Sequence, residues 1–221
     1  MPQNTREKMT KGTSTPAKVR MTAVERRAAI LNAAIHVFVE RSYGGATTAE
    51  IAKEAECNEA LIFRHFGSKL ELFVASLERA TELICEEAEE SAGTTESGLA
   101  QLRALAYSKA RDGGGRYRDL GRLRFVAAAE ARDPVIADAL SKHMNGLQAW
   151  TAGRLRAAQQ LGELSPDVDP ELAAWEWSGV MTLTSLRVMA GDKAASTDFE
   201  RMANELIDGW TSPQAAGRRA R

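Results

Sequence analysis

The sequence contains few cysteines, few aromatic residues and no long apolar run. Two cysteines in 221 residues are too few for a disulfide framework, which argues against a small secreted protein held together by cross-links. No apolar stretch approaches the roughly eighteen residues that a membrane-spanning helix needs, so we expect no membrane span. The first twenty residues are polar and charged, so we expect no secretory signal and a cytoplasmic protein.

The residue groupings of catalytic and metal sites are also missing. The three histidines, His36, His65 and His143, are far apart in the sequence and match no metal-ligand spacing. The glycines at 113–115 are not followed by the Lys-Ser/Thr of a phosphate-binding loop, and no nucleophile elbow is present. Two glutamates follow Cys85 and favour its protonated thiol. We therefore expect neither an enzyme nor a cofactor.

The formal net charge of −1 hides an asymmetry between the two parts of the chain. Residues 1–70 contain eleven Lys and Arg against seven Asp and Glu, whereas residues 71–221 contain eighteen against twenty-three. This pattern indicates that the front of the chain meets a polyanion. A chance scatter of surface charge would give the same counts.

The chain is rich in Ala and Leu, which favour helix, and its apolar residues recur at three- and four-residue spacing. Four Thr or Ser residues, each followed three positions later by Glu, predict helix starts: Thr22 with Glu25, Thr47 with Glu50, Ser68 with Glu71, and Thr197 with Glu200. Together these signals predict an all-α fold of nine helices. The expected ranges are 22–41, 47–55, 59–65, 68–91, 97–111, 117–131, 134–160, 170–190 and 197–210.

Four segments follow from this pattern. Residues 1–21 are expected to be a disordered basic arm, which either contacts phosphates or is a solvated leader without a role. Residues 22–70 form the predicted DNA-binding domain, and residues 71–212 a second helical domain for ligand binding and dimerisation. Residues 213–221 are expected to be a disordered tail.

The stretch from Thr47 to Phe73 is the most informative one. Two short helices joined by a tight turn at 56–58 have the arrangement of a helix-turn-helix, with Ile51, Cys57 and Ile62 filling the wedge between them. The second helix would enter the major groove, and cations and helix N-termini around it suit phosphate. The candidate DNA-binding residues are Thr47, Thr48, Asn58, Glu59, Ala60, Leu61, Phe63, Arg64, His65 and Lys69. A three-helix unit used only for protein contact is the alternative.

The motif I-A-x-x-A-x-x-x-x-x-L-I-F-R-H-F-G-S-K-x-E-L-F over residues 51–73 strongly resembles the DNA-binding domain of the TetR-type bacterial repressors. The resemblance implies a nine-helix subunit, dimerisation through the last two helices and a small-molecule cavity in the C-terminal domain. This sequence departs from the family pattern at four positions. Ser42 and Glu56 stand where glycine is usual, Phe63 replaces Tyr, and Leu61 stands where Thr is common.

Two further sets of residues belong to the second domain. Wide apolar stripes on the last two helices predict a four-helix dimer interface that contains Leu172, Leu183, Leu186, Phe199, Met202, Leu206 and Trp210. The cavity implied by the resemblance would be lined by Tyr107, Phe125, Met144, Leu147, Trp150, Trp175, Trp177 and Met181. Ordinary intrachain core is the alternative for both sets. Arg122 and Arg124 are expected in solvent, with an acidic ligand as the other reading.

Together these features predict a homodimeric transcriptional repressor that binds a near-palindromic double-stranded operator and is released by an unknown small-molecule effector. Two other hypotheses remain. One keeps the DNA-binding domain but gives the second domain a protein partner instead of a small molecule. The other is an enzyme that uses the rear cavity, against which the missing catalytic groupings argue.

Overall fold

The computed structural model describes residues 21–93, 97–111 and 115–211. For residues 108–111 and 115–118 it describes the backbone alone. Within these residues the chain forms nine helices and no strand, which confirms the predicted all-α fold. The helices are α1 (Ala23–Gly45), α2 (Thr48–Glu54), α3 (Glu59–Phe66), α4 (Lys69–Ala92), α5 (Gly98–Arg111), α6 (Gly115–Ala129), α7 (Pro134–Gln160), α8 (Pro170–Met189) and α9 (Ala195–Trp210). The predicted basic arm, apart from Met21, and the predicted tail lie outside the described residues.

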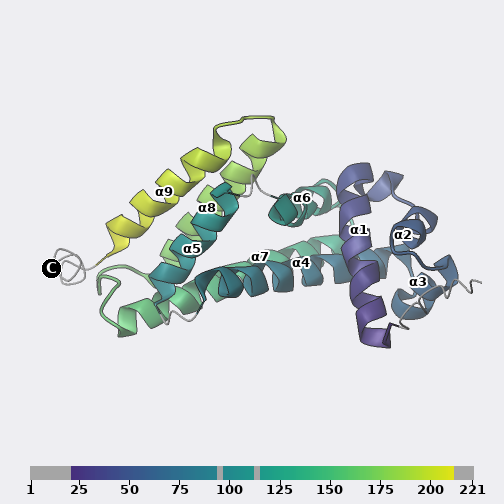
Figure 1. Ribbon diagram of the computed structural model, residues 1–221, viewed down its shortest axis with the longest axis horizontal. Coiled ribbons are helices and arrows are strands. Elements are labelled where there is room, and N and C mark those ends of the chain that lie inside the picture. The colour runs from purple at the N-terminus through teal and green to yellow at the C-terminus, as the bar shows by residue number, and fades with distance from the viewer. Residues whose placement is uncertain (1–20, 94–96, 112–114, 212–221) are drawn as a thin grey trace, which may run out of the picture.

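The helices form two groups that share one long connecting element (Figure 1). Helices α1, α2 and α3 gather at one end, and α4 runs from them along the length of the molecule beside α7. Helices α5, α8 and α9 lie at the opposite end, where α5 packs against α9 and α8 packs against both α7 and α9. Helix α6 contacts α1 as well as α4, α7 and α8, so it joins the two groups.

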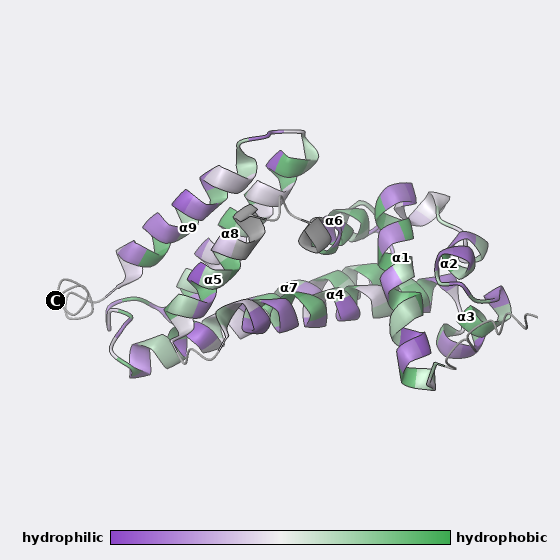
Figure 2. Ribbon diagram, viewed as in Figure 1, coloured by the Kyte–Doolittle hydropathy of each residue, from purple (hydrophilic) through white to green (hydrophobic). Residues whose placement is uncertain are grey.

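Most of the helices have one apolar face, α3 and α9 most clearly, and hydrophobic and hydrophilic residues alternate along the ribbons in Figure 2. In the first group, α1 contributes Ile30, Leu31 and Phe38 to the core. The Phe38 ring meets the Phe73 ring of α4 edge-on, with their centroids 4.8 Å apart. This packing fixes the angle between α1 and α4, and thus the place of the first group on the rest of the chain. No helix of the described residues has the length and apolar character required to cross a bilayer.

The helix starts follow the predicted caps in part. Both bonds of the capping box form at Thr22 and at Thr47. At Ser68 the side chain accepts from the Glu71 backbone N–H (3.1 Å), but the Ser68 N–H donates to the Phe66 carbonyl (2.9 Å) instead of to a glutamate. That box is therefore only half formed.

The predicted cap at Thr197 is wrong. Helix α9 begins two residues earlier, at Ala195, and has no side-chain cap. The turn that precedes it is held by Asp192, whose carboxylate accepts from the Ala194 backbone N–H (2.9 Å). Because this turn starts the helix, Thr197 falls inside the first turn of α9.

Among the described residues, two that are not glycine have positive φ where the family pattern has glycine. Ser42 (φ 61°, ψ 168°) breaks the helical backbone directly after the predicted end at Arg41, and one further turn of α1 follows as far as Gly45. Glu56 (φ 48°) lies in the turn after α2 and has a left-handed backbone conformation. Both conformations are strained for a residue with a Cβ.

Candidate nucleic-acid interface and interior cavity

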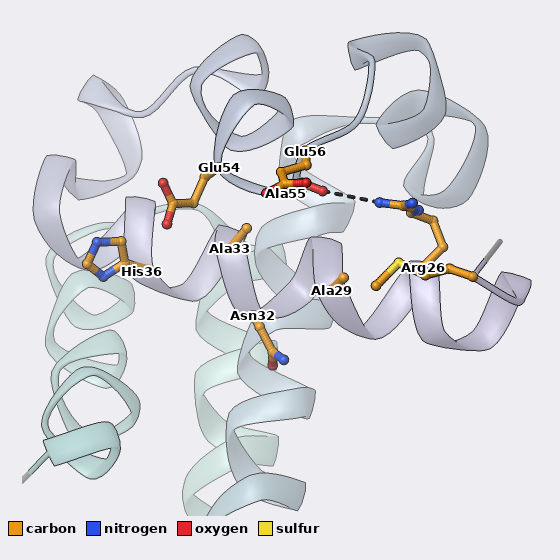
Figure 3. A pocket seen from close by; sticks show the side chains of 9 residues that line it. Arg26, Ala29, Asn32, Ala33, His36, Glu54, Ala55 and Glu56 are labelled. Atoms are coloured by element: carbon orange, nitrogen blue, oxygen red, sulfur yellow. Dashed lines mark hydrogen bonds between the residues drawn. The ribbon is translucent and has the colours of Figure 1, made fainter. Parts of the chain in front are cut away.

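Helix α2, the turn at 56–58 and helix α3 form the helix-turn-helix. The Cys57 backbone N–H donates to the Ala52 carbonyl (2.9 Å), and the Asn58 side chain accepts from the Leu61 N–H (2.9 Å) and caps α3. Helix α1 supports the turn from below, because Arg26 Nη1 donates to the Ala55 carbonyl (3.2 Å), as the dashed line in Figure 3 shows. Figure 3 looks into the shallow groove that α1 and the turn form around this contact.

The inner faces of α2 and α3 are closely packed. Ile51 and Ile62 are fully buried, and Phe66 is nearly so. Cys57 is half-buried and packs against the same core; burial raises the pKa of its thiol, while the charge of Arg26 acts in the opposite direction. The Cys57 thiol therefore stays protonated at neutral pH and acts as a small apolar filler.

The outer face of α3 carries most of the predicted DNA-binding residues. Asn58, Glu59, Ala60, Phe63 and Arg64 are exposed. The half-buried members are Leu61, which packs on the core, and His65, whose ring centroid is 6.1 Å from that of Phe66. The face therefore presents one cation, one carboxylate and an exposed phenyl ring.

Several of these polar groups already have partners. The Thr48 hydroxyl donates to the Glu59 carboxylate, which holds Glu59 against the start of α2. The Thr47 hydroxyl accepts from the Glu50 N–H (3.2 Å) and donates to the Glu50 carboxylate (2.9 Å). These hydrogen bonds fix the orientation of the side chains and occupy part of the capacity that phosphate would use.

Lys69 lies at the start of α4 beside this face. Its Nζ donates to the Ala46 carbonyl (2.9 Å) and lies 4.6 Å from the centre of the Tyr43 ring. An ammonium group has three donors, so two remain for another acceptor. Lys69 thus ties α4 to the residue before the α2 cap while its charge stays at the edge of the helix-turn-helix.

Sequence reasoning missed one cation of this surface. Arg27 is exposed on α1, and its guanidinium lies 4.8 Å from the centre of the Phe66 ring, at the C-terminal end of α3. This placement depends on how α1 crosses α3, and no spacing in the sequence encodes that crossing.

The second group of helices surrounds a small interior cavity of about 40 Å³. The lining residues come from α4, α5, α6, α7 and α8: Ile84, Leu105, Arg124, Met144, Leu147, Trp150, Thr151, Trp177, Ser178 and Met181. Five of the eight residues proposed from the sequence are among them. The structure places Tyr107 and Trp175 on the surface, 55% and 48% exposed. Phe125 is half-buried and lies outside the lining.

Arg124 differs from the solvated side chain that the sequence suggested. It is only 7% exposed, because α6 is covered by α4, α7 and α8. Its Nε donates to the Gly121 carbonyl (2.9 Å) and its Nη1 to the Thr182 hydroxyl (3.2 Å). Burial lowers the pKa of the guanidinium to about 10, so Arg124 is still a cation at neutral pH. Arg122, by contrast, is partly exposed and lies 3.8 Å from the Glu40 carboxylate of α1.

The proposed dimer residues divide between surface and core. Helix α8 exposes three of them, Leu172, Leu183 and Leu186, which are 61%, 49% and 50% exposed. Trp175 and Met189 of the same helix are also exposed. The α9 residues point inward instead: Phe199 and Trp210 are buried, and Met202 and Leu206 are half-buried. The reason is that α9 covers α5 and α8 of its own chain, and the Trp210 indole N–H donates to Glu176 of α8 (2.9 Å).

The remaining histidines and cysteines do not form a site. The described residues include no group of His, Cys, Asp or Glu that could hold a metal ion. His36 Nδ1 is 3.2 Å from the Asp119 carboxylate and so links α1 to α6. Burial, with help from Glu89, raises the pKa of the Cys85 thiol to about 11, which leaves it unreactive at neutral pH.

Two family models match the chain. The model for bacterial regulatory proteins of the tetR family covers residues 30–76, which hold the helix-turn-helix. The model for a tetracyclin repressor-like C-terminal domain covers residues 123–202, which hold Arg124 and the exposed face of α8. The two matches thus fall on the two groups of helices.

Curated proteins and a solved structure agree with these matches. The transcriptional activator FasR of Mycolicibacterium smegmatis is 39% identical over 80 residues, which are 36% of each chain. The transcriptional regulator UidR of Escherichia coli is 27% identical over 83% of this chain and 91% of its own. A Rhodococcus sp. protein assigned to the TetR family has the same fold, with a TM-score of 0.76 and 22% identity over 86% of this chain and 100% of its own.

Proposed function

Because the chain belongs to the TetR family of bacterial regulatory proteins, we propose that it represses transcription from a near-palindromic operator and leaves that operator when a small molecule binds. The chain is a transcriptional regulator with a helix-turn-helix DNA-binding domain, and not an enzyme. The observation that carries the proposal is the exposed outer face of α3, flanked by the cations of Arg27 and Lys69.

In this proposal α3 lies in the major groove. Arg64 suits the acceptors of guanine, Glu59 suits the amino group of cytosine, and Phe63 suits the methyl group of thymine. Lys69 and Arg27, together with the capped N-termini of α2 and α4, contact phosphates on either side of the groove. The phosphate contacts supply most of the affinity, and the α3 side chains supply the choice of sequence.

The operator is near-palindromic because the regulator is a homodimer. The support is the apolar row that α8 exposes, Leu172, Leu183 and Leu186, beside the half-buried Met202 and Leu206 of α9. A second copy would cover this row in a two-fold symmetric contact. The two α3 helices then read half-sites about 34–36 Å apart. A DNA-bound regulator of this kind acts in the cytoplasm.

Helix α6 would transmit the effect of ligand binding from the cavity to the DNA-binding helices and so cause release from the operator. This helix lines the cavity with Arg124 and contacts α1 through His36–Asp119 (3.2 Å) and Arg122–Glu40 (3.8 Å). A ligand that widens the cavity moves α6 and, with it, α1 and the reading helix. The distance between the two α3 helices of the dimer then no longer matches the groove spacing.

Activation is the second candidate function, because FasR, the relative with 39% identity, is named an activator. The decisive experiment joins binding to a transcription readout. A labelled fragment upstream of the chain's own gene is titrated with the protein, and transcription from the same fragment is measured in vitro. Repression lowers the transcript as the fragment becomes occupied, and a rise identifies an activator. If the protein does not bind the fragment even at low salt, both repression and activation are contradicted.

A further inference from the structure

The most buried arginine among the described side chains has no acidic partner. Arg124 is 7% exposed and makes its hydrogen bonds only to a carbonyl and a hydroxyl. None of the described carboxylates forms an ion pair with it, and burial is the cause of its lowered pKa. A buried cation without an anionic partner is costly to the folded state, so its presence calls for an explanation.

The chain treats its more exposed arginines differently. Arg79 pairs with Glu86 (3.0 Å), and Arg187 pairs with Asp198 (2.7 Å). Both guanidinium groups are more exposed than that of Arg124 and lose less hydration. The charge of Arg124 is therefore left unpaired at the place where a carboxylate would stabilise it most.

The surroundings of Arg124 show where a partner would fit. Arg124 lines the interior cavity, and its Nη2 makes no hydrogen bond to the described residues. The walls nearby are apolar and aromatic, with Met144, Trp177 and Met181 from α7 and α8. A ligand that satisfied this site would need an anionic end for Arg124 and an apolar body for the walls.

A second buried side chain near Arg124 has one nitrogen without a hydrogen bond. His143 is 2% exposed and its Nε2 makes no hydrogen bond, while its Nδ1 is 2.7 Å from the Thr81 hydroxyl. Its pKa is lowered to about 4 by burial and then by the charge of Arg124, so it is neutral and close to that charge. The interior beside Arg124 thus contains two polar groups with unused hydrogen-bonding capacity.

We propose that the effector is an organic acid whose carboxylate pairs with Arg124 and whose apolar or aromatic body lies between Met144, Trp177 and Met181. This inference rests on the proposed function, since it names the chemical class of the small molecule that the regulator binds. Arg124 provides the charge recognition, and the aromatic and methionine side chains select for an apolar body over a hydrated inorganic anion.

The size of the cavity agrees with a ligand that changes the structure. About 40 Å³ holds on the order of two or three water molecules and is too small for an organic acid. The flexible side chains of Met144 and Met181 can move aside, and further room comes from displacing α6, α7 or α8. Binding therefore requires the helix movement on which release depends.

The experiment measures binding by thermal shift and by quenching of tryptophan fluorescence, since Trp150 and Trp177 line the cavity. The probes are octanoate and phenylacetate, their neutral amides octanamide and phenylacetamide, and sodium sulfate. We expect an acid to raise the Tm and its amide to do so much less. We expect Arg124→Gln to weaken binding of the acid by about tenfold or more. Arg124→Lys keeps the charge and restores part of the affinity, and Arg132→Gln, an exposed control, binds like the wild type.

Three outcomes overturn the inference: equal binding of acid and amide, equal binding by wild type and Arg124→Gln, or no binding by either acid. If sulfate raises the Tm as much as the acids do, the apolar body of the ligand contributes nothing to binding, and this outcome also overturns the inference. Release from DNA is measured separately. If the acids bind through Arg124 but leave the operator complex intact, the acid-binding site at Arg124 stands, and the proposed release by that acid is wrong.

Discussion

Lys69 Nζ donates a 2.9 Å hydrogen bond to the carbonyl of Ala46, so the first residue of α4 holds the segment that leads into α2. The same ammonium group lies over the Tyr43 ring of α1. One side chain therefore connects α1, the α2 cap and α4, and it does so at the edge of the surface that faces DNA in our proposal. Substitution of Lys69 should affect both binding and stability.

We expect Lys69→Ala to weaken binding to every DNA sequence by a similar factor and to lower the slope of log affinity against log salt by about one. We also expect the free energy of unfolding to fall by about 1 kcal/mol, because the Ala46 hydrogen bond is lost. Fluorescence anisotropy at several salt concentrations and urea unfolding measure the two effects. Lys142→Ala, an exposed lysine of α7, is the control. A sequence-dependent loss would assign Lys69 to base contacts.

Replacement of the two strained residues by glycine should stabilise the protein. Ser42 (φ 61°) and Glu56 (φ 48°) occupy backbone conformations that glycine adopts without strain. We expect Ser42→Gly and Glu56→Gly each to raise the free energy of unfolding by about 0.5–1 kcal/mol. Ser42→Ala and Glu56→Ala keep the Cβ and should give no such gain. If alanine stabilises as much as glycine, the strain is not in the backbone.

Acid should destabilise the protein through His143. Burial, and to a smaller extent the charge of Arg124, lowers the pKa of His143 from 6.5 to about 4. Between these two pH values the unfolded chain binds a proton at His143 that the folded chain does not. Stability from this group is therefore full well above pH 6.5 and falls as the pH drops towards 4, by on the order of 3 kcal/mol. Urea unfolding at several pH values measures the slope. His143→Gln should flatten it, and an unchanged slope would rule out His143 as its source.

The exposed leucines of α8 should hold the dimer together. Leu186 is 50% exposed and Leu183 is 49% exposed on the same helix, and a charge in their place cannot be buried against a second copy. We expect Leu186→Glu to give a monomer that binds an operator far more weakly. Val135→Glu changes an apolar residue of similar exposure (48%) on α7, and this variant should remain a dimer. Analytical ultracentrifugation distinguishes the two, and a dimeric Leu186→Glu would place the interface elsewhere.

The sequence predicted the local features of the fold well. The nine helices of the described residues and the capping boxes at Thr22 and Thr47 all depend on residues within a few positions of one another. Short-range rules are sufficient for such features. The start of α9 was missed, because the turn held by Asp192, and not the Thr197–Glu200 pair, precedes the first residue of the helix.

Features that depend on packing between distant segments could not be predicted. Periodicity marked the apolar stripes of α8 and α9 but could not tell which face meets the chain's own core, so Phe199 and Trp210 were assigned to the interface together with Leu186. The burial of Arg124 depends on three helices from later and earlier parts of the chain. The stacking of Arg27 on Phe66 likewise depends on the angle between α1 and α3.

Salt-dependent binding to duplex DNA tests the central claim most directly. The affinity of the wild-type chain for its own upstream fragment is measured by fluorescence anisotropy at increasing salt, beside Arg64→Ala on fragments with single base-pair changes. We predict a linear fall of log affinity with log salt, and for Arg64→Ala a loss of about 1–3 kcal/mol that disappears when one particular base pair is changed. Two results would contradict the placement of α3 in the major groove. One is an affinity for DNA that does not change with salt concentration, and the other is an Arg64→Ala variant that discriminates among the fragments as the wild type does.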